Sequence, residues 1–85
     1  MANVEIYLRM SCPYCVRAMR LLDMKKVEPR VHDVEEEPSA RGEMIQRSGG
    51  RTTVPQIFID GQLIGGCDDL MDLEYDGKLD GLLAA

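Results

Sequence analysis

The chain has 85 residues, enough for one small domain over residues 1–85 but near the low end of the size that folds alone. Its 15 acidic and 10 basic residues give a net charge of −5, which argues against nucleic acid or an anionic membrane as the main partner. No apolar run reaches the length of a membrane span and the N-terminus lacks the pattern of a secretory signal, so we expect a cytoplasmic protein.

The first expected elements flank a pair of cysteines. Residues 4–8 alternate apolar and polar side chains with the period of a β-strand, and apolar residues after Cys15 recur at helical spacing. Pro13 suits the first position of a helix, which puts Cys12 at or beside the N-cap. There the free N–H groups of the first turn and the helix dipole favour a thiolate. We therefore expect Cys12 to be exposed and deprotonated, and Cys15 to lie nearer the core.

The rest of the chain alternates strand and helix signals. Ser48-Gly49-Gly50 is expected to end a helix, and Asp60-Gly61 to join two antiparallel strands. The expected elements after the first helix are a strand at 30–34, a helix capped by Ser39 or by the acids before it that ends at 46–48, strands at 54–59 and 62–64, and a helical region from 67 to 83. The order β-α-β-α-β-β-α predicts an α/β fold, with a four-stranded mixed sheet flanked by helices and its first two strands parallel.

Redox exchange is the favoured use of the cysteine pair. A zinc site needs four ligands, and nothing spaces Cys67 and His32 as a second pair of donors, so no metal site is predicted. A structural disulfide across so short a loop would constrain the unfolded chain little. Such bonds are also rare in the cytosol. His32 is expected to be a half-exposed strand residue and not a catalyst.

Three motifs in this order resemble those of dithiol glutaredoxins, with the greatest likeness to the small bacterial glutaredoxin 3 type. They are Cys12-Pro13-Tyr14-Cys15, Thr53-Val54-Pro55 and Gly65-Gly66-Cys67-Asp68-Asp69-Leu70. The resemblance covers essentially the whole chain and implies a thioredoxin-like fold. It also implies a glutathione-dependent oxidoreductase that reduces protein disulfides and glutathione mixed disulfides. Glutathione would be the co-substrate, and no metal would be required.

The resemblance also implies roles for single residues. Cys12 would be the nucleophile and Cys15 the resolving cysteine, while Pro55 would follow a cis bond and leave the Val54 backbone free to pair with the tripeptide. The other implied glutathione contacts are Arg9 at the glycine carboxylate, Tyr14 beside the sulfurs, Thr53, and Gly66, Cys67, Asp68 and Asp69 around the γ-glutamyl end. Gly49-Gly50 looks like one extra residue, which leaves the role of Arg51 open.

Several alternatives remain open. Cys67 is expected to be a small buried residue at a helix start, without a redox role. The methionines expected to fill the aliphatic core are Met10, Met19, Met24, Met44 and Met71. A glutaredoxin-like protein reduced by thioredoxin reductase is one rival function, and a glutathione-ligated iron–sulfur carrier is another. The first is disfavoured by Arg9 and the Gly-Gly-Cys-Asp-Asp motif, and the second by the rigid Pro13. We expect a monomer whose partners are glutathione and disulfide-containing or glutathionylated proteins.

Overall fold

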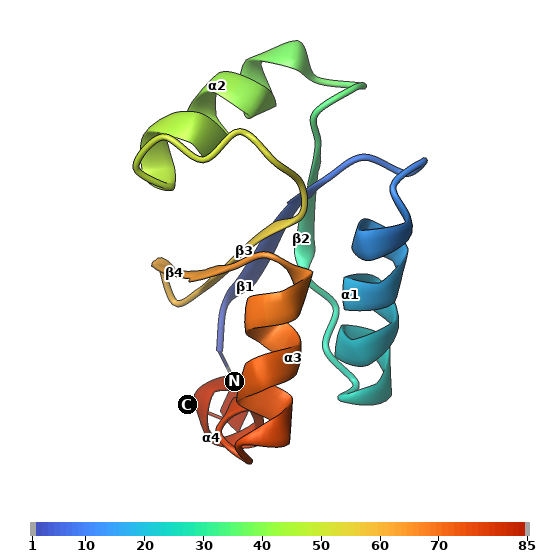
Figure 1. The fold of residues 1–85 in the computed structure, drawn as a ribbon, viewed down its shortest axis with the longest axis vertical. Helices are drawn as coiled ribbons and strands as arrows, with labels where there is room; N and C mark the ends of the chain where they lie inside the picture. The colour runs from blue at the N-terminus through green and yellow to red at the C-terminus, as the bar shows by residue number, and fades with distance from the viewer. Residues whose placement is uncertain (1, 85) are drawn as a thin grey trace.

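The computed structural model describes residues 2–84, whose strands and helices follow the expected order up to the last helical region (Figure 1). The elements are β1 (Val4–Leu8), α1 (Pro13–Met24), β2 (Arg30–Asp33), α2 (Pro38–Arg47), β3 (Gln56–Ile59), β4 (Gln62–Gly65), α3 (Cys67–Tyr75) and α4 (Leu79–Ala84). The last helical region is divided in two, because Gly77 adopts a positive φ of 70° between α3 and α4.

The four strands form one mixed sheet in the order β2-β1-β3-β4. The pair β1–β2 is parallel, and both β1–β3 and β3–β4 are antiparallel, which confirms the predicted α/β architecture. Asp60 and Gly61 carry positive φ angles of 50° and 81°, so the turn between β3 and β4 has the left-handed backbone expected of an Asp-Gly hairpin. In Figure 1, α1 and α3 stand on one side of the sheet and α2 crosses its other side.

The central strand β1 is buried on both faces. Ile6 and Leu8 belong to the larger core cluster, shared with α1, α3 and α4, whereas Tyr7 packs with Met44 and Phe58 under α2. The alternation in β1 predicted one polar face, yet Tyr7 is completely buried because α2 covers that face.

Two of the five methionines expected in the core are on the surface. Met10 is 69% exposed and Met24 is 77% exposed, so the prediction is wrong for both. Met10 lies in the turn before α1, and Met24 is the last residue of that helix, so neither faces the sheet. Met44 is fully buried as expected.

The start of α2 uses the second of the two predicted caps, one of the acids before Ser39. Ser39 lies inside the helix, which begins at Pro38 with Glu37 as a cap that makes no side-chain hydrogen bond. The preceding loop is held instead by Asp33, whose Oδ1 accepts from the amides of Glu35 and Glu36 at 2.9 and 3.1 Å. A proline at the first helical position pre-sets the backbone for the helix, which explains why the helix starts there.

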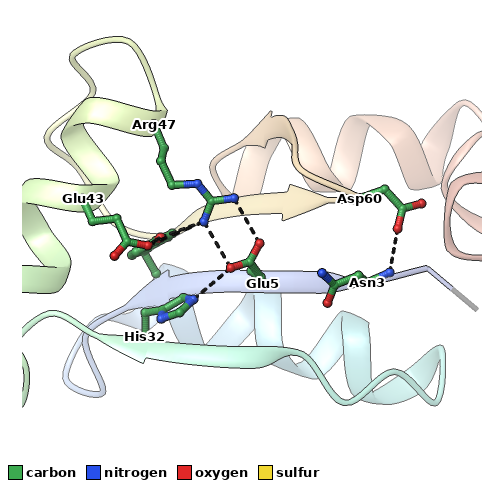
Figure 2. Close-up of polar contacts among 7 residues, drawn as sticks. Asn3, Glu5, His32, Glu43, Arg47 and Asp60 are labelled. Carbon is green, nitrogen blue, oxygen red and sulfur yellow. Dashed lines mark hydrogen bonds and ion pairs between the residues drawn. The ribbon is translucent and has the colours of Figure 1, made fainter.

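A polar network ties α2 to β1 and β2 (Figure 2). Arg47 donates to both carboxylate oxygens of Glu5 at 3.1 and 3.0 Å, and to the Tyr7 hydroxyl at 2.7 Å. The Tyr7 hydroxyl donates to Glu43, and the His32 ring contacts Glu5 at 3.1 Å. A bidentate arginine–carboxylate pair that is mostly shielded from water fixes the helix in one orientation on the sheet.

The Glu5 carboxylate should make stability fall in acid. Its pKa is lowered by the Arg47 hydrogen bond, against the opposing effect of burial and with help from His32. Because the folded-state pKa is below the ordinary value of 4.5, this contribution is complete above that pH and is lost as the pH falls through the folded pKa. At neutral pH, Glu5→Gln should destabilise the fold by about 1–3 kcal/mol.

Urea unfolding at a series of pH values tests this expectation. The difference between wild type and Glu5→Gln should shrink as the pH falls below 4.5. The exposed Glu28 offers a matched control, since Glu28→Gln should follow the wild type throughout. A difference that stays constant across the acid range would show that the Glu5 charge does not stabilise the fold.

Candidate functional site

The sequence folds locally so that the first cysteine caps a helix. Cys12 has an extended backbone (φ −90°, ψ 120°), Pro13 is the first residue of α1, and the Val16 amide donates to the Cys12 carbonyl at 3.1 Å. The predicted N-cap position of Cys12 is therefore confirmed. It places the sulfur beside the free N–H groups of the first helical turn.

Both cysteines of the pair are buried. Cys12 is only 6% exposed, so the prediction of an exposed Cys12 is wrong, whereas the prediction that Cys15 is the more buried is confirmed at 1%. Cys12 is covered because it packs into the core cluster and its thiol donates to the Val54 carbonyl at 3.8 Å. Cys12, Cys15 and Cys67 are all free thiols.

The two sulfurs have opposite acidities. Burial acts to raise the pKa of Cys12, but the Cys15 amide, the Cys15 thiol, the Tyr14 amide and the Arg9 charge together bring it below its ordinary value. Burial, together with the neighbouring Cys12 sulfur, raises the pKa of Cys15 to about 11, although the Arg9 amide and charge oppose the shift. Cys12 is thus the more acidic thiol of the pair and ionises before Cys15.

The rate of alkylation against pH should reveal this difference. With iodoacetamide, Cys12 should reach its plateau rate at a pH below that of an ordinary thiol of pKa about 8.5, because only the thiolate reacts. In the Cys12→Ser variant, the remaining labelling should rise only in alkaline solution, since burial is the largest cause that raises the pKa of both Cys15 and Cys67. If the pH midpoint of Cys12 alkylation were at or above that of free cysteine, Cys12 would not be the more acidic thiol of the pair.

A cleft of about 540 Å³ opens beside the dithiol, between the turn before β3 and the start of α3. It brings together eight of the nine residues that sequence reasoning proposed as ligand contacts. They are Tyr14, Thr53, Val54, Pro55, Gly66, Cys67, Asp68 and Asp69. The Val54–Pro55 bond is cis, as the resemblance implied. Cys67 is 4% exposed as the first residue of α3, which confirms its placement as a small buried residue at a helix start.

Arg9 is the one proposed contact that does not line the cleft; it lines a second groove, on the α1 side. The cation in the cleft is Arg51, whose guanidinium lies 3.5 Å from Asp69. Asp69 also accepts from the Gly66 amide at 2.9 Å and so holds the start of α3. The position of Arg51 two residues before Thr53 was a signal that it could reach the cleft. The extra glycine at Gly49-Gly50 left open whether Arg51 matches the binding residue of the family.

Sequence reasoning missed Gln56. This side chain is 2% exposed, and its amide nitrogen donates to the Thr53 carbonyl at 3.0 Å and contacts the Thr53 hydroxyl at 3.4 Å. Its carbonyl oxygen has no partner among the described residues. Gln56 lies in a β-prone run, where a polar residue is usually read as a side chain that faces solvent. No signal in the sequence therefore distinguishes this buried glutamine from an exposed one. It braces the turn that carries Val54.

The arrangement suits an extended, doubly charged ligand next to a nucleophile. The first residues of α3 line the cleft, and the amides of a first helical turn are a good site for a carboxylate, while Asp68 offers the opposite charge to an ammonium group. Tyr14 is 54% exposed at the mouth, with the Arg17 guanidinium 5.6 Å from its ring centre. Within residues 2–84, no group of three or more His, Cys, Asp or Glu side chains could hold a metal ion. No helix in that range is long and apolar enough to cross a membrane.

Comparison with known proteins agrees with this chemistry. The glutaredoxin family model matches residues 4–64. The chain is 58% identical to glutaredoxin 3 of Escherichia coli K12 over 83 residues, which covers 98% of this chain and 99% of that protein. Among solved structures, it is similar to the glutaredoxin of Brucella melitensis (53% identity, TM-score 0.83, 98% and 89% coverage) and to a buckwheat glutaredoxin–glutathione complex (30%, 0.89, 98% and 77%). The chain therefore belongs to the glutaredoxin family of thiol–disulfide oxidoreductases.

Proposed function

We propose that the protein uses glutathione to reduce glutathione mixed disulfides and protein disulfides. The observation that carries this proposal is the position of Cys12: its sulfur contacts the Val54 carbonyl, and Val54 lines the cleft that brings together all the proposed ligand contacts except Arg9. A glutathione sulfur bound along Val54 would therefore lie next to the nucleophile. The structural similarity to a buckwheat glutaredoxin complexed with glutathione supports the same ligand.

The exchange proceeds in two steps. The Cys12 thiolate attacks the glutathione sulfur of a mixed disulfide; a new S–S bond forms, the old one breaks, and the substrate leaves as a thiolate. A second glutathione thiolate then attacks that glutathione sulfur, which releases glutathione disulfide and restores Cys12. For a protein disulfide, Cys15 loses its proton and displaces the substrate from Cys12, leaving a Cys12–Cys15 disulfide. Two glutathiones reduce this disulfide in turn.

Binding groups follow from the lining of the cleft. The Val54 backbone would pair with the extended tripeptide, and the amides at the start of α3, with Asp68, would bind the γ-glutamyl carboxylate and ammonium. Thr53 and Tyr14 would flank the peptide, and Asp69 would keep the helix start in place. Arg51 and Arg9 are the cations we propose for the glycine carboxylate. The protein is proposed to act as a cytoplasmic monomer on disulfide-containing or glutathionylated proteins.

A coupled assay tests the proposal. Wild-type protein should turn over a glutathione mixed disulfide with NADPH, glutathione and glutathione reductase, and should be inactive with NADPH and thioredoxin reductase alone. The reverse result would make it a glutaredoxin-like electron donor for which the cleft is not a glutathione site. A brown, dimeric protein on purification would instead favour the iron–sulfur carrier.

A further inference from the structure

A second groove runs along the other side of the dithiol, and of its lining residues the proposed glutathione chemistry uses only Arg9 and Cys15. It has a volume of about 590 Å³ and is lined by residues of α1, of β2 and of the end of β1 with the turn that follows it. Figure 1 shows α1 beside β2, which is an edge strand of the sheet. Its lining residues are Leu8, Arg9, Met10, Cys15, Val16, Met19, Arg20, Asp23 and Val31. We call this surface the α1–β2 groove. The dithiol therefore lies between two openings, one lined by Tyr14 and the other by Cys15.

The groove exposes apolar side chains that the fold does not need. Met10 is 69% exposed, Val16 is 41% exposed and Val31 is 45% exposed. Within residues 2–84, these three are half of the large apolar side chains that are exposed to solvent. They come from the turn before α1, from α1 and from β2, and yet they converge on one groove. Exposed apolar side chains scattered singly are ordinary, but a group gathered at a reactive centre is a recognition surface.

The rim of the groove has the opposite charge to the protein. The chain carries a net charge of −5, but the groove has two arginines, Arg9 and Arg20, against one acid, Asp23. A basic rim on an acidic protein selects acidic partners and disfavours basic ones, chiefly through the rate of encounter. The apolar floor requires the same partner to present an aliphatic side chain.

We propose that the α1–β2 groove docks the polypeptide of a protein disulfide substrate, and that it selects cysteines flanked by aliphatic and acidic residues. The site adjoins the reactive pair, because Cys15 lines its floor and Val16 follows Cys15 in α1. Two unbranched methionine side chains, Met10 and Met19, let the floor adapt to different aliphatic residues. A substrate held here leaves the cleft on the opposite side free.

The test uses the two electrons that the reduced Cys12 and Cys15 thiols supply, so it does not depend on glutathione. The Cys12 thiolate attacks a peptide disulfide and releases one peptide thiolate; deprotonated Cys15 then attacks the Cys12 sulfur, releases the second peptide thiolate and leaves the Cys12–Cys15 disulfide. The rate is measured in single turnover with homodimeric peptide disulfides whose cysteine is flanked by leucine and glutamate, leucine and lysine, or serine and glutamate. Hydroxyethyl disulfide is the small reference substrate.

Wild-type protein should reduce the leucine–glutamate peptide about tenfold faster than either other peptide, with the preference over lysine fading at high salt. The double variant Arg20→Glu/Val31→Glu should lose that preference and keep the wild-type rate with hydroxyethyl disulfide. The matched control Met24→Glu/Arg41→Glu makes the same kinds of change at exposed positions outside the groove and should retain the preference.

Three results would overturn the proposal. The first is equal wild-type rates with all three peptides, which needs no variant and so does not depend on a variant folding. The second is a preference that survives in the Arg20→Glu/Val31→Glu protein. The third is a wild-type protein that is a dimer in sedimentation equilibrium and reacts alike with all three peptides, with the dimer lost in the Arg20→Glu/Val31→Glu variant. The groove would then bind a second copy of the chain. Failure of the glutathione assay alone would leave the docking proposal intact.

Discussion

The Cys12→Ser variant is expected to lose essentially all disulfide-exchange activity, by about 10³-fold or more. Serine keeps the size of the side chain but is not ionised near neutral pH, so the nucleophile is absent. Cys12 is the residue whose pKa the helix start and Arg9 hold below its ordinary value, and the higher pKa of Cys15 makes it a poor replacement. Turnover of a glutathione mixed disulfide in the coupled assay measures the loss.

The companion variant Cys15→Ser separates the two reactions. It should keep turnover of the glutathione mixed disulfide, because that exchange uses one protein sulfur, and it should lose reduction of a dithiol substrate disulfide, which uses both. Cys67→Ser serves as a control, since that buried thiol is expected to have no redox role. Residual dithiol reduction in Cys15→Ser that disappears in a Cys15→Ser/Cys67→Ser protein would contradict this assignment.

Replacing Gly65 by alanine should damage both the fold and the cleft. Gly65 has a positive φ of 119°, which side chains rarely adopt, and a Cβ there would overlap the Asp69 carboxylate and lie 2.9 Å from Arg51 Nη1. Asp69 cannot move aside without leaving the Gly66 amide that it caps. We expect a loss of about 2–4 kcal/mol in the free energy of unfolding. The Michaelis constant for the glutathione mixed disulfide should rise at the same time.

Gly42→Ala is the matched control, to be measured by urea unfolding beside Gly65→Ala. Gly42 lies in the interior of α2, and a Cβ added there meets no atom within 4 Å. Alanine is the better helix former, so this variant should gain about 0.5–1 kcal/mol without any change in turnover. If Gly65→Ala were as stable as wild type, the hydrogen bond from the Gly66 amide to Asp69 would not depend on the absence of a side chain at position 65.

Much of the fold could be predicted because local signals agreed with one another. Pro13 after Cys12 predicted where α1 begins, because its fixed φ suits a helix and its missing N–H costs nothing at the first position. Asp60-Gly61 predicted the hairpin, because these residues tolerate the positive φ angles of its turn. The burial of Tyr7 could not be predicted from β1 alone, because it follows from a helix more than thirty residues away. The same limit applies to Met10, whose exposure depends on where the turn before α1 points.

The residues of the cleft were largely anticipated through the family resemblance, whereas their contacts were not. The enclosure of Cys12 depends on the Val54 carbonyl, 42 positions along the chain, and no spacing in the sequence encodes such a contact. Arg51 lies in the cleft and Arg9 in the α1–β2 groove because of how two turns fold in space. The brace that Gln56 provides is equally a product of tertiary geometry.

The two ends of the described chain meet. The Ala2 amide donates to the Leu83 carbonyl at 3.2 Å. In Figure 1 the start of β1 and α4 lie together at the bottom of the view, below the turn that leads into α1. A module whose entry and exit adjoin can be grafted into a surface loop of a host protein with little distortion of either partner. We expect such an insertion to present the dithiol outward, with both openings beside it unobstructed, so that the domain can serve as a transplantable redox unit.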